Sequence, residues 1–461
     1  MELCMVFSSP IFNQFVEQSP LSVLNQGLIT RVLTPEVLDE WFDNTVEEQY
    51  TRDLLFSCVF EIMTDVVRGS KSSVYAAYTA LEDKIGVSAT SVYNKLNGIE
   101  CNTSAELVRY SANSVAPIIE KLGGKAENPL PGYNVKIIDG NCIKASEHRI
   151  KELRDITGGA LPGKSLVIYD PVLRMPVDVI PCEDGHAQER SLFNELAKRA
   201  KPMEVWLMDR NFCTRKLLFS IAKSEGSFIV RQHGQFPFHE IEEETNIGTV
   251  ETGSVFEQLI ETCDENGKML VLRRIRVHLK KETRDGDKNI YILTNLPQQA
   301  ADGTSIAKLY RSRWRIETAF QELEKYYNSE INTLGYPKAA LFGFCVALVS
   351  YILVAVAKAA LSCIHGADKI ENETSGYYIA HELSQTYPGM MIALPYSEWS
   401  IFHKLSNDEM VTALKMLVGK VHLRKYKKNP RGKKKPKTKQ KHSPKNAHVS
   451  TAKLISKRKK A

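Results

Sequence analysis

The sequence offers no framework for disulfide bonds or structural zinc. Its nine cysteines are scattered and odd in number, and none forms a C-x2-C pair. Disulfide-stapled domains and zinc ribbons both depend on closely spaced cysteines. The pattern instead fits a reducing cytosol, so we expect a cytoplasmic protein. The N-terminus also lacks a basic segment followed by a long apolar one, so no signal peptide is predicted.

Long apolar runs are scarce, and the one exception is an uncharged stretch of 19 residues at 339–357. Its length alone would suit a membrane span. An all-round apolar pattern is equally typical of a helix buried in the core of a soluble protein. No other segment resembles a span. We therefore expect a buried core helix and no membrane partner.

Acidic residues are absent from the last part of the chain. Residues 420–461 contain 18 of the 61 Lys and Arg and none of the 54 Asp and Glu. Residues 1–419 therefore carry a net charge of −11, although the whole chain carries +7. A low-complexity basic tail should be disordered and should attract nucleic acid without sequence preference. We expect Lys433, Lys434 and Lys435 to contact DNA; a nuclear localisation signal or a merely solvating tail are the alternatives.

The N-terminal part of the chain, up to about position 130, has a helical pattern, and one section of it resembles a helix-turn-helix. A helical stretch at Ser72–Leu81 is followed by Gly86, which permits a tight turn. Ser88 can then cap a second helix, which runs through Ala89–Leu96. Such a pair can place its second helix in the major groove of DNA. The alternative is two packed helices that touch no DNA.

From residue 135 the pattern becomes mixed α/β. A polar segment with two strong strands, 270–279 and 289–294, then separates residues 209 and 317. That gap is too long for a simple connection, so we expect a β-rich insertion at about 232–303. Residues 365–418 look helical. The other predicted strands are 135–139, 165–170, 176–181, 204–209 and 227–231, with helices at about 187–200 and 213–224.

Three carboxylates stand out by their context. Asp139 and Asp209 each end an apolar run that is typical of a buried strand, and ligand chemistry gathers at such strand ends. Tyr310, Arg313 and Glu317 are spaced by three and four residues, which places them on one side of a helix. Guanidinium suits phosphate and carboxylate suits a divalent metal. The alternative is two strand-end turns and a surface ion pair.

Together these motifs resemble the DDE cut-and-paste transposases of bacterial insertion sequences. The resemblance covers roughly residues 130–360. Within this family, the chain most resembles the subgroup with a Tyr-x2-Arg-x3-Glu-x6-Lys block. It implies an RNase H-like mixed sheet with a β-rich insertion, preceded by an all-α N-terminal domain. Its carriers are Asp139-Gly140, Asp209-Arg210-Asn211-Phe212, Thr294-Asn295-Leu296 and the block from Tyr310 to Glu317.

The resemblance also implies the chemistry. Asp139, Asp209 and Glu317 would bind two Mg²⁺ ions, with Mn²⁺ as a substitute, for in-line displacement at phosphorus. Tyr310, Arg313 and Arg210 would contact DNA. The partners would be double-stranded DNA at the transposon ends and at the target, and a second copy of the chain in a synaptic complex. The protein would be bacterial and associated with the nucleoid.

The chain departs from the family pattern at one position. The family Lys should fall at residue 324, where this chain has Glu324, with Lys325 one step later. One residue rotates about 100° around a helix. Either Lys325 reaches back to the DNA, or that phosphate contact is lost.

Two further features have ordinary interpretations. We expect Trp314 to pack in the core rather than stack on a base. The segment with Asp184, His186 and Glu189 follows a predicted strand and could approach the metals, but we favour a turn and a helix start.

The predicted organisation follows from these motifs. A helical DNA-binding domain covers 1–130, an RNase H-like catalytic domain 131–362, a helical region 363–419 and a basic disordered tail 420–461. The predicted function is DNA transposition. The alternatives are an RNase H-like nuclease and a domesticated, catalytically inactive DNA-binding protein.

Overall fold

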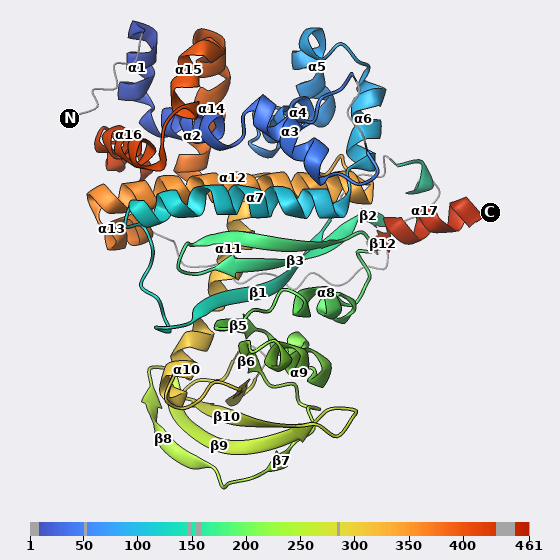
Figure 1. Cartoon of the computed structure of the whole chain (residues 1–461), viewed down its shortest axis with the longest axis vertical. Helices are drawn as coiled ribbons and strands as arrows, with labels where there is room; N and C mark the ends of the chain where they lie inside the picture. The colour runs from blue at the N-terminus through green and yellow to red at the C-terminus, as the bar shows by residue number, and fades with distance from the viewer. Residues whose placement is uncertain are drawn as a thin grey trace.

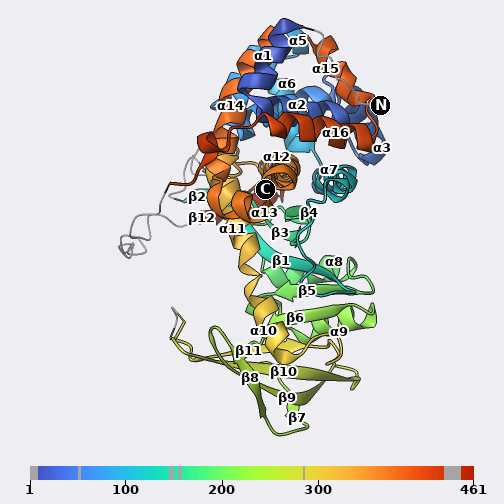
Figure 2. The same cartoon turned by 90° about the vertical axis from the view of Figure 1, so that its left-hand side faces the viewer.

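The molecule is elongated, with a helical end, a central sheet and a curved β end (Figures 1 and 2). The computed structural model describes most of the chain, namely residues 9–49, 53–144, 150–153, 158–283, 286–429 and 448–460.

The central sheet is mixed. Its strands lie in the order β4-β3-β1-β5-β6, antiparallel from β4 to β1 and parallel from β1 to β6. All five were predicted. Their bounds are β1 Asn134–Ile143, β3 Gly163–Asp170, β4 Met175–Cys182, β5 Glu204–Met208 and β6 Ser227–Arg231.

Both faces of this sheet are covered, which explains the near-continuous apolar runs in its strands. Neighbouring residues of β1 are buried in two different hydrophobic clusters, one on each face of the sheet. Ile137 belongs to the first cluster and Ile138 to the second. The second cluster is closed by α8 (Phe193–Ala197) and α9 (Arg215–Lys223). The predicted helix at 187–200 is shorter in the structure, because a 3-10 turn at Glu189–Leu192 precedes α8.

The insertion continues the same sheet instead of forming a separate one. After β6 the order runs β11-β10-β9-β7, and β8 pairs with β9. The predicted strands at 270–279 and 289–294 are confirmed as β10 and β11. The strand β9 was missed, because polar residues such as Gln258 interrupt its pattern. The bounds are β7 His239–Glu240, β8 Thr245–Val250, β9 Gly253–Cys263, β10 Met269–Leu279 and β11 Asn289–Thr294.

Helices form the first part of the chain and most of its last part. The N-terminal set is α1 Pro10–Gln18, α2 Pro20–Val32, α3 Pro35–Thr45, α4 Phe56–Val67, α5 Val74–Ile85, α6 Ala89–Gly98 and α7 Cys101–Lys121. The C-terminal set is α13 Ala367–Glu373, α14 Gly376–Ala393, α15 Tyr396–His403 and α16 Asn407–Gly419.

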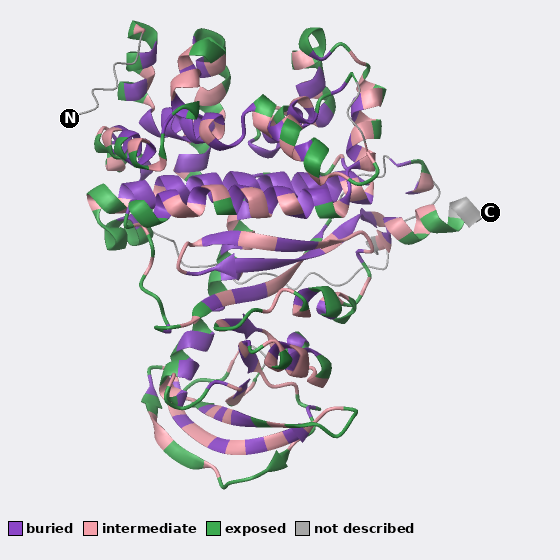
Figure 3. Cartoon of the chain, in the orientation of Figure 1, coloured by how far each residue is buried: buried purple, intermediate pink, exposed green. Residues whose placement is uncertain are grey.

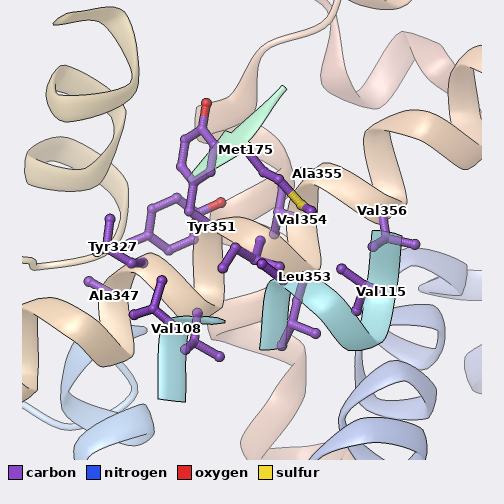
Figure 4. Close-up of a cluster of buried hydrophobic side chains, with 14 of the residues drawn as sticks. Val108, Val115, Met175, Tyr327, Ala347, Tyr351, Leu353, Val354, Ala355 and Val356 are labelled. Atoms are coloured by element: carbon purple, nitrogen blue, oxygen red, sulfur yellow. The ribbon is translucent and has the colours of Figure 1, made fainter. Parts of the chain in front are cut away.

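The apolar run at 339–357 lies within α12 (Pro337–His365), which passes between the sheet and the helices. It is the one helix in the described ranges long and apolar enough to span a membrane, and 94% of its most apolar window is buried. It packs against α7. Figure 3 shows that α7 buries part of its surface, and Figure 4 shows Val108 and Val115 of α7 beside Leu353 and Val356 of α12. The burial favours the core-helix interpretation.

The two helical sets share one hydrophobic core. Phe12 of α1 packs against Trp399 of α15, with ring centroids 4.9 Å apart, and Gly27 of α2 packs against the ring of Phe402. The domain boundaries at 130 and 363 therefore remain predictions. A fragment ending at residue 130 would expose the apolar face that α2 presents to α15.

The helix-turn-helix pattern has the expected local structure. α5 ends at Gly86, which adopts φ +66°, a left-handed conformation that costs glycine little. The Ser88 side chain accepts a hydrogen bond from the Ser91 backbone N–H and so caps α6. The observed bounds of both helices lie close to the predicted ones.

The tail prediction is wrong in part. A short strand, β12 (His448–Ser450), pairs in parallel with β2 (Gly159–Leu161), and α17 (Thr451–Lys460) follows. Val449 and Leu454 pack against a small apolar cluster around Leu153, a contact that the charge of the tail concealed. Lys433, Lys434 and Lys435 lie outside the described residues.

Candidate active site

Asp139 lies within β1, and Asp209 directly follows the neighbouring parallel strand β5. Ile137 of β1 is paired with Leu207 of β5, so each aspartate follows two residues after a paired position. Asp209 also begins a 3-10 turn, where its carboxylate accepts a hydrogen bond from the Asn211 backbone N–H at 2.8 Å. The register of the sheet thus brings both carboxylates to one place, as the sequence predicted.

The signature block is not one continuous helix, as its spacing suggested. α10 (Gly303–Arg311) ends, and α11 (Trp314–Tyr326) begins after the junction Ser312-Arg313. The junction is closed by backbone bonds between residues three apart, such as Arg313 N–H to Tyr310 C=O. This tighter winding replaces one α-helical turn.

Arg313 joins the block to the sheet. One guanidinium nitrogen lies 3.0 Å from Asp139 Oδ2, and another lies 2.8 Å from Glu317 Oε1. Arg313 is 8% exposed, and its Nε has no hydrogen-bond partner in the structure. A single buried cation therefore bridges two carboxylates that are far apart in the sequence.

Tyr310 supports this cation from the preceding helix. It is 8% exposed, and the nearby charge of Arg313 opposes the rise in its phenol pKa that burial causes. Burial raises the pKa of the Tyr310 phenol to about 12, so the phenol remains protonated at neutral pH. In this arrangement Tyr310 contacts Arg313 and faces away from bulk solvent.

The site has more negative charge than Arg313 balances. The pKa of Asp139 is raised to about 6, first by burial and then by the charges of Asp209 and Glu317, against the opposing effect of Arg313. A raised carboxyl pKa means that the surroundings disfavour the ionised form. Another cation near Asp139 would remove this penalty.

The donor set suits a hard divalent cation, because Mg²⁺ prefers carboxylate oxygens. Within the described ranges, however, no three His, Cys, Asp or Glu side chains are arranged as a ready metal site. Arg313 explains this, since its guanidinium lies between Asp139 and Glu317. The residues fit a metal provided that Arg313 gives up part of its pairing.

The charge imbalance predicts a stability effect. Above pH 6 the folded chain buries the ionised Asp139; between about pH 6 and 3.8 the folded carboxyl takes up a proton before the unfolded one does. The destabilisation therefore disappears as pH falls through this window. Asp139→Asn should stabilise the metal-free protein by about 3 kcal/mol at pH 7, and by little at pH 4. Urea unfolding in chelator at both pH values measures this; a loss of stability at pH 7 would contradict it.

Two other predicted site residues, Arg210 and Lys325, lie at the surface. Arg210 is exposed in the turn after Asp209, and Lys325 is exposed near the end of α11. Glu324, seven residues after Glu317, lies on nearly the same side of the helix, whereas Lys325 is rotated away from it. The structure therefore does not bring Lys325 to Asp139, and its role stays a prediction.

Trp314 was expected in the core, and this is wrong. Its side chain is 61% exposed at the start of α11, and the Arg313 guanidinium lies 5.6 Å from its ring centroid. The side chains of α11 that are buried instead include Ile316 and Ala319. One signal for this was present in the sequence, because Trp314 lies two residues before Ile316, on a different side of the helix.

The central part of the chain is similar to a known protein family. Residues 130–352 match the family model described as the transposase DDE domain. A solved piggyBac transposase synaptic complex with hairpin DNA is similar over 82% of each chain, at 12% identity. Its TM-score of 0.34 is too low to carry an argument. Among curated proteins, none matches the chain.

The matched segment contains Asp139, Asp209 and Glu317, together with the Arg313 bridge. The family match thus supports a DDE-type transposase.

Proposed function

We propose that this protein is a transposase that cleaves DNA at the ends of its element and joins the new 3′-OH to target DNA. The observation that carries the proposal is the Arg313 bridge between Asp139 and Glu317, with Asp209 close enough to raise the pKa of Asp139. This cluster lies inside the segment similar to the transposase DDE domain.

The strand order supports an RNase H-like assignment for the catalytic part. Antiparallel β3 and β4 lie on one side of β1, and parallel β5 and β6 lie on the other. Asp139, Asp209 and Glu317 would hold Mg²⁺, or Mn²⁺ in its place. When bound, two such ions stabilise the attacking and leaving oxygens of displacement at phosphorus.

Arg313 has two roles in this proposal. Without DNA it holds Asp139 and Glu317 in place and offsets their mutual repulsion. If Asp139 and Glu317 held a metal ion, the Arg313 guanidinium would be free to bind a DNA phosphate near the scissile bond. Tyr310 holds the guanidinium from behind in both states.

Recognition of the element ends is assigned to α5 and α6, and two copies of the chain would pair two ends. The side chains of Thr90 and Asn94 are exposed on α6 and can form hydrogen bonds with base edges. Val92 and Leu96, on the other side of the helix, are buried. The proposed setting is the bacterial nucleoid.

This assignment predicts a loss of sequence preference. Thr90→Ala with Asn94→Ala in the full-length chain should reduce the preference for a terminal-repeat duplex over random duplex by roughly tenfold or more, since a good base contact contributes about 1–3 kcal/mol. Thr79→Ala, an exposed change on α5, is the control. Competition binding at physiological salt measures the preference. An unchanged preference would place end recognition elsewhere.

A nuclease and an inactive DNA-binding protein are the alternative functions. Strand transfer separates them. Full-length protein is incubated with pre-cut element ends and a supercoiled plasmid in Mg²⁺. A transposase joins the ends to the plasmid, a nuclease only degrades DNA, and an inactive protein leaves both unchanged.

A further inference from the structure

The segment between β4 and α8 approaches the proposed active site without a role in it so far. Glu189 begins the 3-10 turn Glu189–Leu192, on the chain between these two elements. Its side chain is only partly exposed, although its neighbours Gln188 and Arg190 are both exposed. The side chain is therefore directed inward from an exposed segment.

Glu189 occupies a space that only glycine leaves open. A Cβ atom added to Gly140 would overlap Oε1 of Glu189 and lie 3.0 Å from its Cδ. Gly140 directly follows Asp139 on β1, and its backbone N–H donates to Asp139 Oδ1 at 2.9 Å. The Glu189 carboxylate thus lies against the backbone that carries Asp139.

The same carboxylate contacts the turn after Asp209. The turn that begins at Glu189 packs against the turn Arg210–Phe212. Burial and the charge of Asp209 raise the pKa of Glu189, and the nearby Asn211 side chain opposes this rise. The backbone N–H of Asn211 is in turn a donor to Asp209. Glu189 therefore links the backbone after Asp139 to the turn that carries Asp209.

The segment that carries Glu189 is held in place at two other points. Lys164 of β3 donates to the Ala187 carbonyl. Asp184 accepts from Ser450 Oγ at 2.6 Å and pairs with Lys453 at 3.0 Å, so the docked C-terminus holds the start of the segment. Gly185 packs directly against Leu161 of β2.

We propose that Glu189 is a positioning residue of the active site, which fixes the Asp209 turn against the Gly140 backbone so that Asp139 and Asp209 keep the separation that a shared divalent cation requires. This inference rests on the proposed function. Because Asn211 needs an acceptor rather than a charge, an amide oxygen at residue 189 can serve. Residues that orient metal ligands typically change metal affinity by about 10–100-fold when they are removed.

The test is Mn²⁺ titration of the full-length protein without DNA. Glu189→Ala should weaken Mn²⁺ binding by about 10–100-fold, and Glu189→Gln should recover most of the loss. Gly140→Ala should weaken binding while every carboxylate is retained, because its methyl group displaces Glu189. The exposed neighbour change Gln188→Ala is the control. Thermal unfolding in chelator checks that each variant is folded.

The outcomes separate the inference from the proposed function. Wild-type affinity in Glu189→Ala, or a loss in Glu189→Gln as large as in Glu189→Ala, overturns the positioning role while Asp209→Asn still loses Mn²⁺. If Asp139→Asn and Asp209→Asn also bind Mn²⁺ like the wild type, the proposed function fails. Should Gly140→Ala fail to fold, the Ala and Gln variants at residue 189 decide alone.

Discussion

Cleavage of a labelled element end is expected to fall by about 10³-fold or more when Asp139 is replaced by Asn, Asp209 by Asn or Glu317 by Gln. Metal stabilisation of the transition state contributes several kcal/mol, and a tenfold change in rate corresponds to about 1.4 kcal/mol. Each replacement has nearly the same size as the original side chain but no charge. The packing around Arg313 should therefore be kept while the negative charge is lost. Binding to the end should change little, because α5 and α6 lie in the distant helical end (Figure 1).

Nicking rates with Mg²⁺ and with Mn²⁺ measure this effect. Glu324→Gln is a matched control, because it removes an exposed carboxylate from the same helix as Glu317. It should not lose cleavage. A variant of Asp139, Asp209 or Glu317 that cleaves near the wild-type rate would remove that residue from the triad.

The second large effect concerns non-specific DNA affinity. The net charge of −11 on residues 1–419 would repel the phosphates of DNA. The basic residues of 420–461 should therefore supply much of the attraction to DNA. Replacing the six lysines between 433 and 441 with glutamine should reduce the slope of log K against log salt by up to about five, since each phosphate contact contributes about 0.9. The affinity of the glutamine variant for random duplex at low salt should fall as well.

Binding isotherms at several salt concentrations measure the slope. Arginine at the same six positions is the control, because it keeps the charge, and the wild-type slope should persist. Substitution is preferable to truncation after Gly419, which would also remove the buried Tyr426 and the docked β12. Parallel lines for the glutamine variant and the wild type would show that these lysines do not contact DNA.

The parts of the fold that the sequence predicted share one property, strong local patterning. The run Val205–Met208 is apolar throughout and Val135–Ile138 is apolar except for Lys136, as expected of strands covered on both faces. Gly86 and Ser88 mark the α5–α6 turn by their own backbone preferences. Both aspartates could therefore be found without a structure, although only Asp209 lies at a strand end and Asp139 lies in the middle of β1, which continues to Ile143.

The parts that the sequence did not predict depend on distant contacts. The break at Ser312–Arg313 has no glycine or proline to mark it. β9 is a strand because Gln258 and Glu257 find arginine partners on β10. The docking of β12 depends on β2, which lies in a distant part of the sequence. Glu189 meets Gly140 only once β1 and the segment after β4 are folded together.

We expect the Asp139, Asp209 and Glu317 cluster to cut DNA at the boundary of its own element. The most direct test incubates the full-length protein with a duplex that contains the DNA flanking its own gene, in Mg²⁺ and in chelator. The 3′ ends of the products are then mapped. We predict a metal-dependent break with a 3′-OH at the edge of a terminal inverted repeat. Breaks scattered along the duplex, or equal cleavage in chelator, would contradict the account.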